Sequence, residues 1–137
     1  MTPQSLTLEE LSQEALRLWK ELSPGAVLWL SGEIGTGKTT FARALTEHAQ
    51  AEPARSPTFA LVHEYLSPEG LLVHADCYRL REPVEAIDMD FPELMRRARL
   101  LMVEWPERAG TYAPPPNAHL QFSFGESPDR RTIERVR

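Results

Sequence analysis

The chain has 137 residues, 42% of them hydrophobic, which suffices for one compact domain with its own core and argues against a disordered chain. Its net charge of −5 and its single cysteine exclude a protein that holds nucleic acid through a broadly basic face, and a fold built on internal disulfides. No apolar run approaches the roughly 20 residues that cross a bilayer, and no signal-peptide pattern opens the chain. We therefore expect residues 1–137 to form one cytoplasmic domain.

The first part of the chain predicts two helices with a buried strand between them. Thr7 and Glu10 have the spacing of a capping box, and apolar residues then recur every three or four positions through residue 22, which predicts an amphipathic helix over 7–22. The continuous apolar run 26–30 is typical of a buried strand. Helical spacing returns over residues 38–50.

The second part predicts mostly strands. Residues 57–66 and 71–80 read as strands joined by a turn, and 82–98 as a helix in two pieces broken at Pro92. The run 100–105 has the composition of a buried strand. The proline-rich segment 113–118 predicts a stiff, exposed connector, and the alternating stretches 119–124 and 132–136 predict an antiparallel edge pair. The whole is a mixed α/β pattern.

Between the strand at 26–30 and the helix that follows lies a glycine-rich loop with a recognisable function. Gly32 to Thr39 match the P-loop pattern G-x-x-x-x-G-K-[ST] without a gap. Glycines let backbone amides turn inward toward a polyphosphate, and the next helix presents its positive N-terminal end to the same anion. Lys38 can reach the β- and γ-phosphates, and the Thr39 hydroxyl can bind Mg²⁺. The sole asparagine, Asn117, lies in "PPPNAHL", so a guanine-reading N-K-x-D element cannot exist and ATP is favoured.

Two acidic residues follow predicted strands and can complete the site. Asp76 follows "LLVHA" and Glu104 follows "LLMV"; phosphoryl transfer needs an acid near Mg²⁺ and a group that positions the attacking oxygen. Either acid alone could simply face solvent, but both occur in a chain with a P-loop. His74 either orients the aspartate or packs in the core. Cys77 fits a small core residue.

Four motifs together resemble a known family. "GEIGTGKTT", "SPTF", "HADCYRL" and "VEWPER", in this order, resemble the bacterial tRNA threonylcarbamoyladenosine biosynthesis ATPase family (TsaE, also called YjeE). The resemblance covers nearly the whole chain. It implies a single-domain P-loop NTPase fold of α/β class, with a mostly parallel central sheet, antiparallel edge strands and flanking helices.

The resemblance also implies the roles of individual residues. Lys38, Asp76 and Glu104 would be catalytic, and Thr39, Asp76 and Glu104 would surround Mg²⁺; which acid ligates the metal and which positions water stays open. Thr58 of "SPTF" would be a switch residue near the γ-phosphate. The implied ATP/ADP-binding residues are Gly32, Glu33, Ile34, Gly35, Thr36, Gly37, Lys38, Thr39, Thr40, Thr58 and Trp105.

The function that the resemblance implies is a weak ATPase that acts with the subunits TsaB and TsaD. Those partners transfer threonylcarbamoyl to the adenosine next to the tRNA anticodon, so this chain would meet tRNA only through them. Two alternatives remain open from the residues. A small-molecule or nucleoside kinase would use Asp76 as a general base, although the proline-rich stretch after Gly110 replaces the arginine-bearing lid of such kinases. A nucleotide-binding scaffold would keep the loop without hydrolysis.

Overall fold

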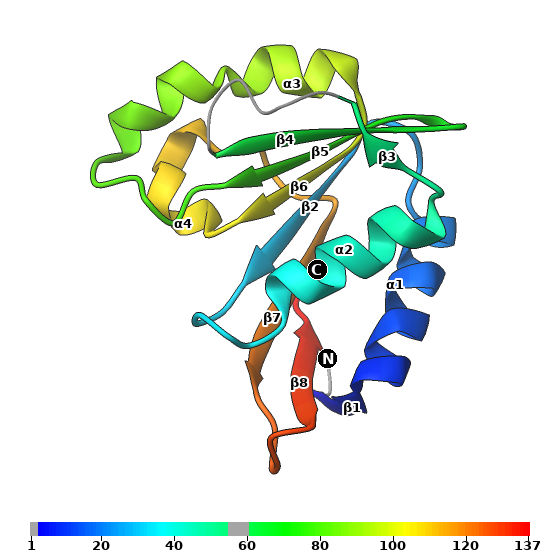
Figure 1. Ribbon diagram of the computed structural model, residues 1–137. Helices are drawn as coiled ribbons and strands as arrows, with labels where there is room; N and C mark the ends of the chain where they lie inside the picture. Colours follow the sequence, from blue (N-terminus) through cyan, green and yellow to red (C-terminus); the bar gives the residue numbers. More distant parts are fainter. Residues whose placement is uncertain (1–2, 55–60) are drawn as a thin grey trace.

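The computed structural model describes residues 3–54 and 61–137. Its strands form one eight-stranded sheet with the order β1-β8-β7-β2-β6-β5-β4-β3, flanked by helices (Figure 1). The strands are β1 (Gln4–Thr7), β2 (Ala26–Ser31), β3 (Glu52–Pro53), β4 (Val62–Ser67), β5 (Gly70–Asp76), β6 (Ala98–Glu104), β7 (Ala118–Phe124) and β8 (Arg130–Arg135). The helices are α1 (Leu8–Glu21), α2 (Lys38–His48), α3 (Phe91–Arg97) and α4 (Pro106–Ala109), with 3₁₀ helices η1 (Pro83–Met89) and η2 (Gly110–Tyr112).

The middle of the sheet is parallel and its margins are antiparallel. Strand β2 pairs in parallel with both β6 and β7, and β6 pairs in parallel with β5. On one side β8 and β1 add antiparallel strands, and on the other side β4 and β3 do the same. The predicted fold class is therefore confirmed.

Alternate side chains of β2 show how the core is divided between the two faces of the sheet. Leu28 and Leu30 pack in a cluster with side chains of α1 and α2, whereas Val27 packs with side chains of η1 and α3. All three are at most 2% exposed. Because helices cover both faces here, the strand reads as one continuous apolar run, as predicted for residues 26–30.

Helix α1 begins where the sequence predicted. The Thr7 side chain accepts a hydrogen bond from the Glu10 amide at 3.2 Å, and the Glu10 carboxylate accepts one from the Thr7 amide at 2.9 Å. This reciprocal capping box satisfies two of the backbone N–H groups that a helix start leaves unpaired.

Several element boundaries differ from the prediction, most of them by one or two residues and three by more or in kind. The helical region 82–98 breaks at Asp90, whose backbone is left-handed (φ 53°), while Pro92 sits in the first turn of α3, where proline is tolerated. The predicted strand 71–80 ends at Asp76. The predicted strand 57–66 begins at Val62 in the described part of the chain, and residues 57–60 lie outside it.

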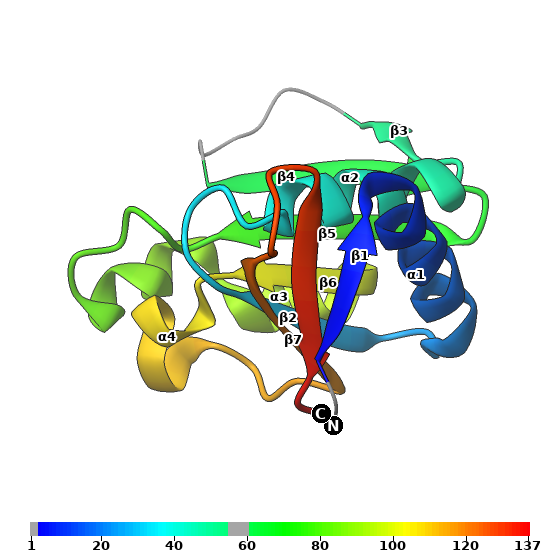
Figure 2. The same cartoon turned by 90° about the horizontal axis from the view of Figure 1, so that it is seen from below.

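The antiparallel pair near the C-terminus is confirmed, but its place in the sheet is different. Strands β7 and β8 pair as predicted, yet β7 also pairs with β2, and β8 pairs with β1, which forms the edge of the sheet (Figure 2). Strand β1 covers four residues before the first helix and was not predicted, because its pairing partner is more than 120 residues away.

The proline-rich connector is not simply exposed. Ala113 and Pro114 are buried, and the Pro114 carbonyl accepts a hydrogen bond from the Trp29 indole at 2.9 Å. The Asn117 side chain accepts one from the Val27 amide at 2.8 Å, and the Asn117 amide donates to the Val27 carbonyl. These bonds hold the start of β7 against β2.

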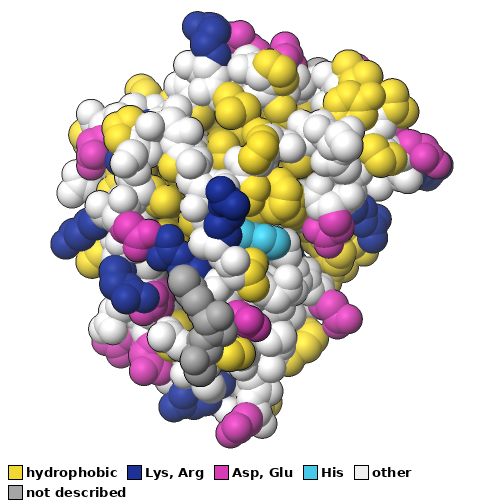
Figure 3. Space-filling view, turned by 180° about the vertical axis from the view of Figure 1, so that it is seen from behind, with side chains coloured by type: hydrophobic (Ala, Val, Ile, Leu, Met, Phe, Trp, Pro, Cys, Tyr) yellow, Lys and Arg dark blue, Asp and Glu magenta, His cyan; other side chains and the backbone are white. Residues whose placement is uncertain are grey.

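The outer surface mixes charged and apolar side chains. Seen from behind, acidic and basic side chains are interspersed, and hydrophobic side chains gather around a histidine (Figure 3). Among the described residues, no helix has the length and apolar character that a bilayer crossing requires.

Candidate nucleotide-binding site

Three parallel strands end together beside the glycine-rich loop. Leu30 of β2 and Asp76 of β5 both lie opposite Glu104 of β6 in the strand register. The loop leaves β2 two residues later. Ligands of parallel α/β sheets bind at this carboxyl edge, and the two acids predicted from sequence are thus placed next to the loop.

The loop itself depends on its glycines. Gly32, Gly35 and Gly37 have φ angles of 140°, 83° and 108°, which side-chain-bearing residues rarely adopt. A Cβ on Gly32 would also lie 2.4 Å from the Phe122 carbonyl oxygen of β7. Gly37 caps α2 without a side-chain hydrogen bond to the helix start, so the first amides of α2 are left for water or an anion.

A cavity of about 330 Å³ opens at this edge of the sheet. It brings together most of the residues predicted from the sequence with three that were not predicted as site residues. Its lining is Leu8, Ile34, Gly35, Gly37, Lys38, Thr39, Thr40, Asp76, Tyr78, Glu104, Trp105 and Arg131.

The remaining predicted residues lie elsewhere. Gly32 and Glu33 line a neighbouring hollow that shares Trp105 with the cavity. Thr36 is buried, and its hydroxyl donates to the Glu33 carbonyl at 2.6 Å, which fixes the turn of the loop. Thr58 lies outside the described residues.

Lys38 starts helix α2 and is only 4% exposed. Its ammonium group donates hydrogen bonds to the carbonyls of Gly32 and Glu33 and lies 4.8 Å from the centre of the Trp105 ring. Burial lowers the pKa of Lys38, and the nearby carboxylates of Glu104 and Asp76 oppose that change. A phosphate at this place would supply a further opposite charge.

Glu104 is the most enclosed acid of the site, with 3% of its surface exposed. The Thr39 hydroxyl donates to its carboxylate at 3.1 Å, and a hydrogen bond joins its Oε2 atom to His74 Nε2. Burial has the largest influence on the pKa of Glu104 and raises it, but the hydrogen bonds from His74 and Thr39, together with the charge of Lys38, bring the pKa below its ordinary value. The carboxylate is therefore ionised at neutral pH.

His74 forms its hydrogen bond with Glu104 and not with Asp76, the acid that is nearer in the sequence. The sequence left two readings open, an orienting partner for Asp76 or a packed core histidine. His74 is 8% exposed, so it is packed, but its hydrogen bond goes across to β6.

Asp76 is half-buried at the end of β5, and its Oδ1 atom accepts a hydrogen bond from the Tyr78 amide at 3.0 Å. Among the described residues, no group of three His, Cys, Asp or Glu side chains lies close enough to hold a metal ion alone. The donor set at this edge, a hydroxyl and two carboxylates, suits Mg²⁺, which keeps several waters and completes its shell with substrate phosphates.

Cys77, next to Asp76, is fully buried, and burial raises the pKa of its thiol to about 12. The prediction of a small core residue agrees with this position. A thiol with so high a pKa is a poor nucleophile, and Cys77 is not among the residues that line the cavity.

An aromatic and cationic group closes one side of the cavity. The rings of Tyr78 and Trp105 lie 5.1 Å apart, and the Arg108 guanidinium lies 5.1 Å from the centre of each. Trp105 has a left-handed backbone (φ 56°). This conformation is costly for a bulky residue, and such strained conformations are concentrated at functional sites. On the other side, Arg131 of β8 donates to the Gly35 carbonyl at 3.2 Å.

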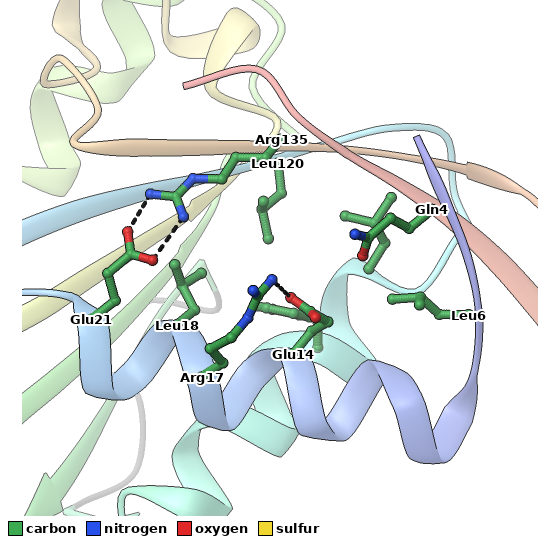
Figure 4. Close-up of a pocket in the computed structure, with 10 residues that line it drawn as sticks. Gln4, Leu6, Glu14, Arg17, Leu18, Glu21, Leu120 and Arg135 are labelled. Atoms are coloured by element: carbon green, nitrogen blue, oxygen red, sulfur yellow. Dashed lines mark hydrogen bonds and ion pairs between the residues drawn. The ribbon is translucent and has the colours of Figure 1, made fainter. Parts of the chain in front are cut away.

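A second cavity of about 330 Å³ lies between α1 and the strands β1, β7 and β8 (Figure 4). Its walls mix apolar side chains with polar and charged ones, among them the ion pair between Arg135 and Glu21. It contains none of the site residues predicted from the sequence.

Comparisons with known proteins identify the family of the chain. The family described as "Threonylcarbamoyl adenosine biosynthesis protein TsaE" matches residues 5–133. A protein of Aquifex aeolicus named "tRNA threonylcarbamoyladenosine biosynthesis protein TsaE" is 38% identical over 102 residues, which cover 72% of this chain and 69% of that protein. A protein of Rickettsia felis with the same name is 35% identical over 101 residues. That match also covers 72% of this chain but only 58% of the longer relative.

Among solved structures, Bacillus subtilis YdiB is similar in fold. It superposes with a TM-score of 0.74 at 24% sequence identity, covering 96% of this chain and 83% of that one. At this identity the likeness bears on the fold alone, and the family is shown by the sequence matches over most of the chain. The chain belongs to the TsaE family of tRNA threonylcarbamoyladenosine biosynthesis proteins.

Proposed function

We propose that residues 1–137 act as one P-loop ATPase domain, which binds ATP with Mg²⁺ in the cavity at the carboxyl edge of the sheet and hydrolyses it slowly. The observation that carries this proposal is the hydrogen bond between the Thr39 hydroxyl and the Glu104 carboxylate, beside Lys38. A P-loop hydroxyl and a strand-end acid hold Mg²⁺ in such proteins. The relatives are named tRNA threonylcarbamoyladenosine biosynthesis proteins, which supports a role of this ATPase in that pathway.

The loop would bind the phosphates through its amides and Lys38. The ammonium group of Lys38 exchanges its bonds with the Gly32 and Glu33 carbonyls for bonds with phosphate oxygens, which are stronger because both partners are charged. ATP is favoured over GTP because the single asparagine, Asn117, already bonds Val27 and cannot read a guanine.

The acids would divide the remaining work. Glu104 stands with Thr39 at the metal, because the two already share a hydrogen bond. Asp76, which is half-buried and lines the same cavity, orients the attacking water. Bound Mg²⁺ would neutralise charge on the β- and γ-phosphates.

The chain would work with TsaB and TsaD in the cytoplasm and meet tRNA only through them. Its cavity is bordered by exposed side chains, Ile34, Thr39 and Tyr78 among them. Water exclusion supplies part of the rate enhancement of phosphoryl transfer, so slow turnover is expected from the chain alone. A partner that covers this side would raise it.

Steady-state ATPase assays with Mg²⁺ test the proposal. Glu104→Gln is expected to lower kcat by about 10²–10³-fold, as loss of one charge-stabilising group does, while calorimetry shows nearly unchanged ATP affinity. Glu47→Gln, which changes an exposed acid in the last turn of α2, serves as the matched control. Normal hydrolysis by Glu104→Gln would remove this residue from the mechanism.

A second assay tests the pathway and the alternative activity. Mixed with TsaB, TsaD and tRNA, the chain is expected to support repeated rounds of adenosine modification with ATP, and Glu104→Gln is not. The same preparation is offered a panel of small alcohols and nucleosides. ATP turnover that depends on one of them, with a phosphorylated product, would favour a kinase instead.

A further inference from the structure

His74 on β5 forms a hydrogen bond with the carboxylate of Glu104 on the neighbouring strand β6. Strand β5 lies beside β6 in parallel register, with His74 opposite Met102, two residues before Glu104. The imidazole bonds Glu104 Oε2 from the β5 side, and the Thr39 hydroxyl bonds the same oxygen from the first turn of α2. The carboxylate is thus fixed between a helix and a neighbouring strand.

The direction of the His74 hydrogen bond follows from the state of its partner. An ionised carboxylate only accepts hydrogen bonds, whereas an imidazole can donate from a ring nitrogen that carries a proton. The hydrogen bond between His74 Nε2 and Glu104 Oε2 therefore requires the tautomer of His74 that carries its proton on Nε2. Such a bond is shorter and stronger than one between neutral groups.

We propose that His74 is a positioning residue for ATP hydrolysis, which fixes the orientation of the Glu104 carboxylate toward Thr39 and the metal position. The inference rests on the proposed ATPase function. Groups that orient a metal-binding side chain in this way commonly change metal affinity or activity by 10–100-fold when they are removed. Without the imidazole, Glu104 would keep only the hydroxyl of Thr39 and could rotate.

The surroundings of His74 argue against a purely packing role. Its side chain lines a small hollow of about 160 Å³ between α2 and the strands, together with Thr39, Ala42, Arg43, Thr46 and Tyr65. Hydroxyls and a guanidinium border this hollow as well as apolar atoms. The imidazole therefore does not lie in a purely apolar core.

The first test needs neither nucleotide nor metal. In the full chain labelled with ¹⁵N-histidine, NMR at neutral pH is expected to show His74 protonated on Nε2, and Glu104→Ala is expected to shift that signal and speed its exchange with water. A His74 ring protonated on Nδ1 alone would overturn the inference. So would a His74 signal that is the same in Glu104→Ala as in the wild type.

The second test compares variants by kcat and KM for ATP. Glutamine places an amide N–H near the position of histidine Nε2, whereas asparagine is too short. His74→Asn is therefore expected to lower kcat by about 10–100-fold with KM within a few-fold, and His74→Gln to restore most of it. His63 lies opposite His74 on β4, with its ring centre 6.2 Å away, and His63→Gln is the control with normal kcat.

The outcomes separate the two proposals. If the wild-type chain hydrolyses ATP but His74→Asn and His74→Gln have equal kcat, the positioning role is wrong and the ATPase proposal stands. If the wild-type chain does not hydrolyse ATP, the proposed function fails, while the NMR result still decides the hydrogen bond. Because the position of the His74 proton is measured on the wild-type protein, a variant that fails to fold leaves the inference testable.

Discussion

Lys38 is one of only two lysines in the chain, and the two differ in their exposure to solvent. Lys20 is exposed on α1, whereas Lys38 is buried at the start of α2 with its ammonium group against loop carbonyls. Burial disfavours the charged form of Lys38 and lowers its pKa. An anion in the cavity would reverse this influence, so binding and charge are coupled at this residue.

We predict that Lys38→Ala weakens ATP binding by about 10–100-fold, the worth of one charge-assisted hydrogen bond. Lys20→Ala removes the same side chain from an exposed helix position and is expected to leave affinity unchanged. Calorimetric titration with a non-hydrolysed ATP analogue and Mg²⁺ measures both. Equal affinities of Lys38→Ala and the wild type would contradict the assignment of the loop.

At the scale of the elements, the loop is held by its contact with β7. Gly32 has a φ of 140°, and its α-carbon faces the Phe122 carbonyl so closely that a Cβ would lie 2.4 Å from the oxygen. Gly25, before β2, also has a positive φ, of 87°, but a Cβ there would meet nothing within 4 Å. Alanine substitutions at the two glycines therefore distinguish the cost of backbone strain from the cost of steric overlap.

We predict that Gly25→Ala lowers the free energy of unfolding by about 1–2 kcal/mol, the cost of a left-handed backbone. Gly32→Ala adds a forced shift of β7 or of the loop and should cost about 1–3 kcal/mol more, as overpacking does. Urea unfolding followed by tryptophan fluorescence measures both. A Gly32→Ala variant as stable as Gly25→Ala would show that the loop or β7 can shift without a further cost in the free energy of unfolding.

Elements whose signals are local could be predicted from the sequence. The capping box of α1 and the apolar run of β2 lie within single short stretches, and both form as predicted. The P-loop pattern is contiguous too, so Lys38 and Thr39 could be predicted as site residues without knowing the fold. Asp76 and Glu104 were predicted because each directly follows an apolar run, and all four residues line the same cavity.

Features that depend on distant pairing could not be predicted. Strand β1 owes its existence to β8, and Arg131 reaches the loop from that same strand. The partner of His74 is 30 residues away, on a strand whose register the sequence does not state. The break at Asp90 was placed at Pro92 because proline is the stronger local signal, although a proline in the first turn of a helix interrupts nothing.

At the scale of the whole molecule, the arrangement of charge limits what the chain can bind alone. The net charge is −5, and several arginines are engaged by carboxylates, including Arg97 with Glu64 and Arg135 with Glu21. The face seen in Figure 3 carries both signs mixed together. Affinity for nucleic acid comes largely from phosphate neutralisation by clustered basic side chains, and a negative net charge with arginines already paired to carboxylates weakens it.

We predict that the chain alone binds tRNA no more tightly than a dissociation constant of about 10⁻⁴ M at physiological salt, the weak end of nonspecific binding. Fluorescence anisotropy with labelled tRNA measures this, first with the chain alone and then with TsaB and TsaD present. With the partners, the chain is expected to join a complex that holds tRNA, since they would supply the basic surface. Micromolar binding by the isolated chain, with a steep salt dependence, would mean that it contacts tRNA directly, and the partner-mediated part of the proposed function would have to be abandoned.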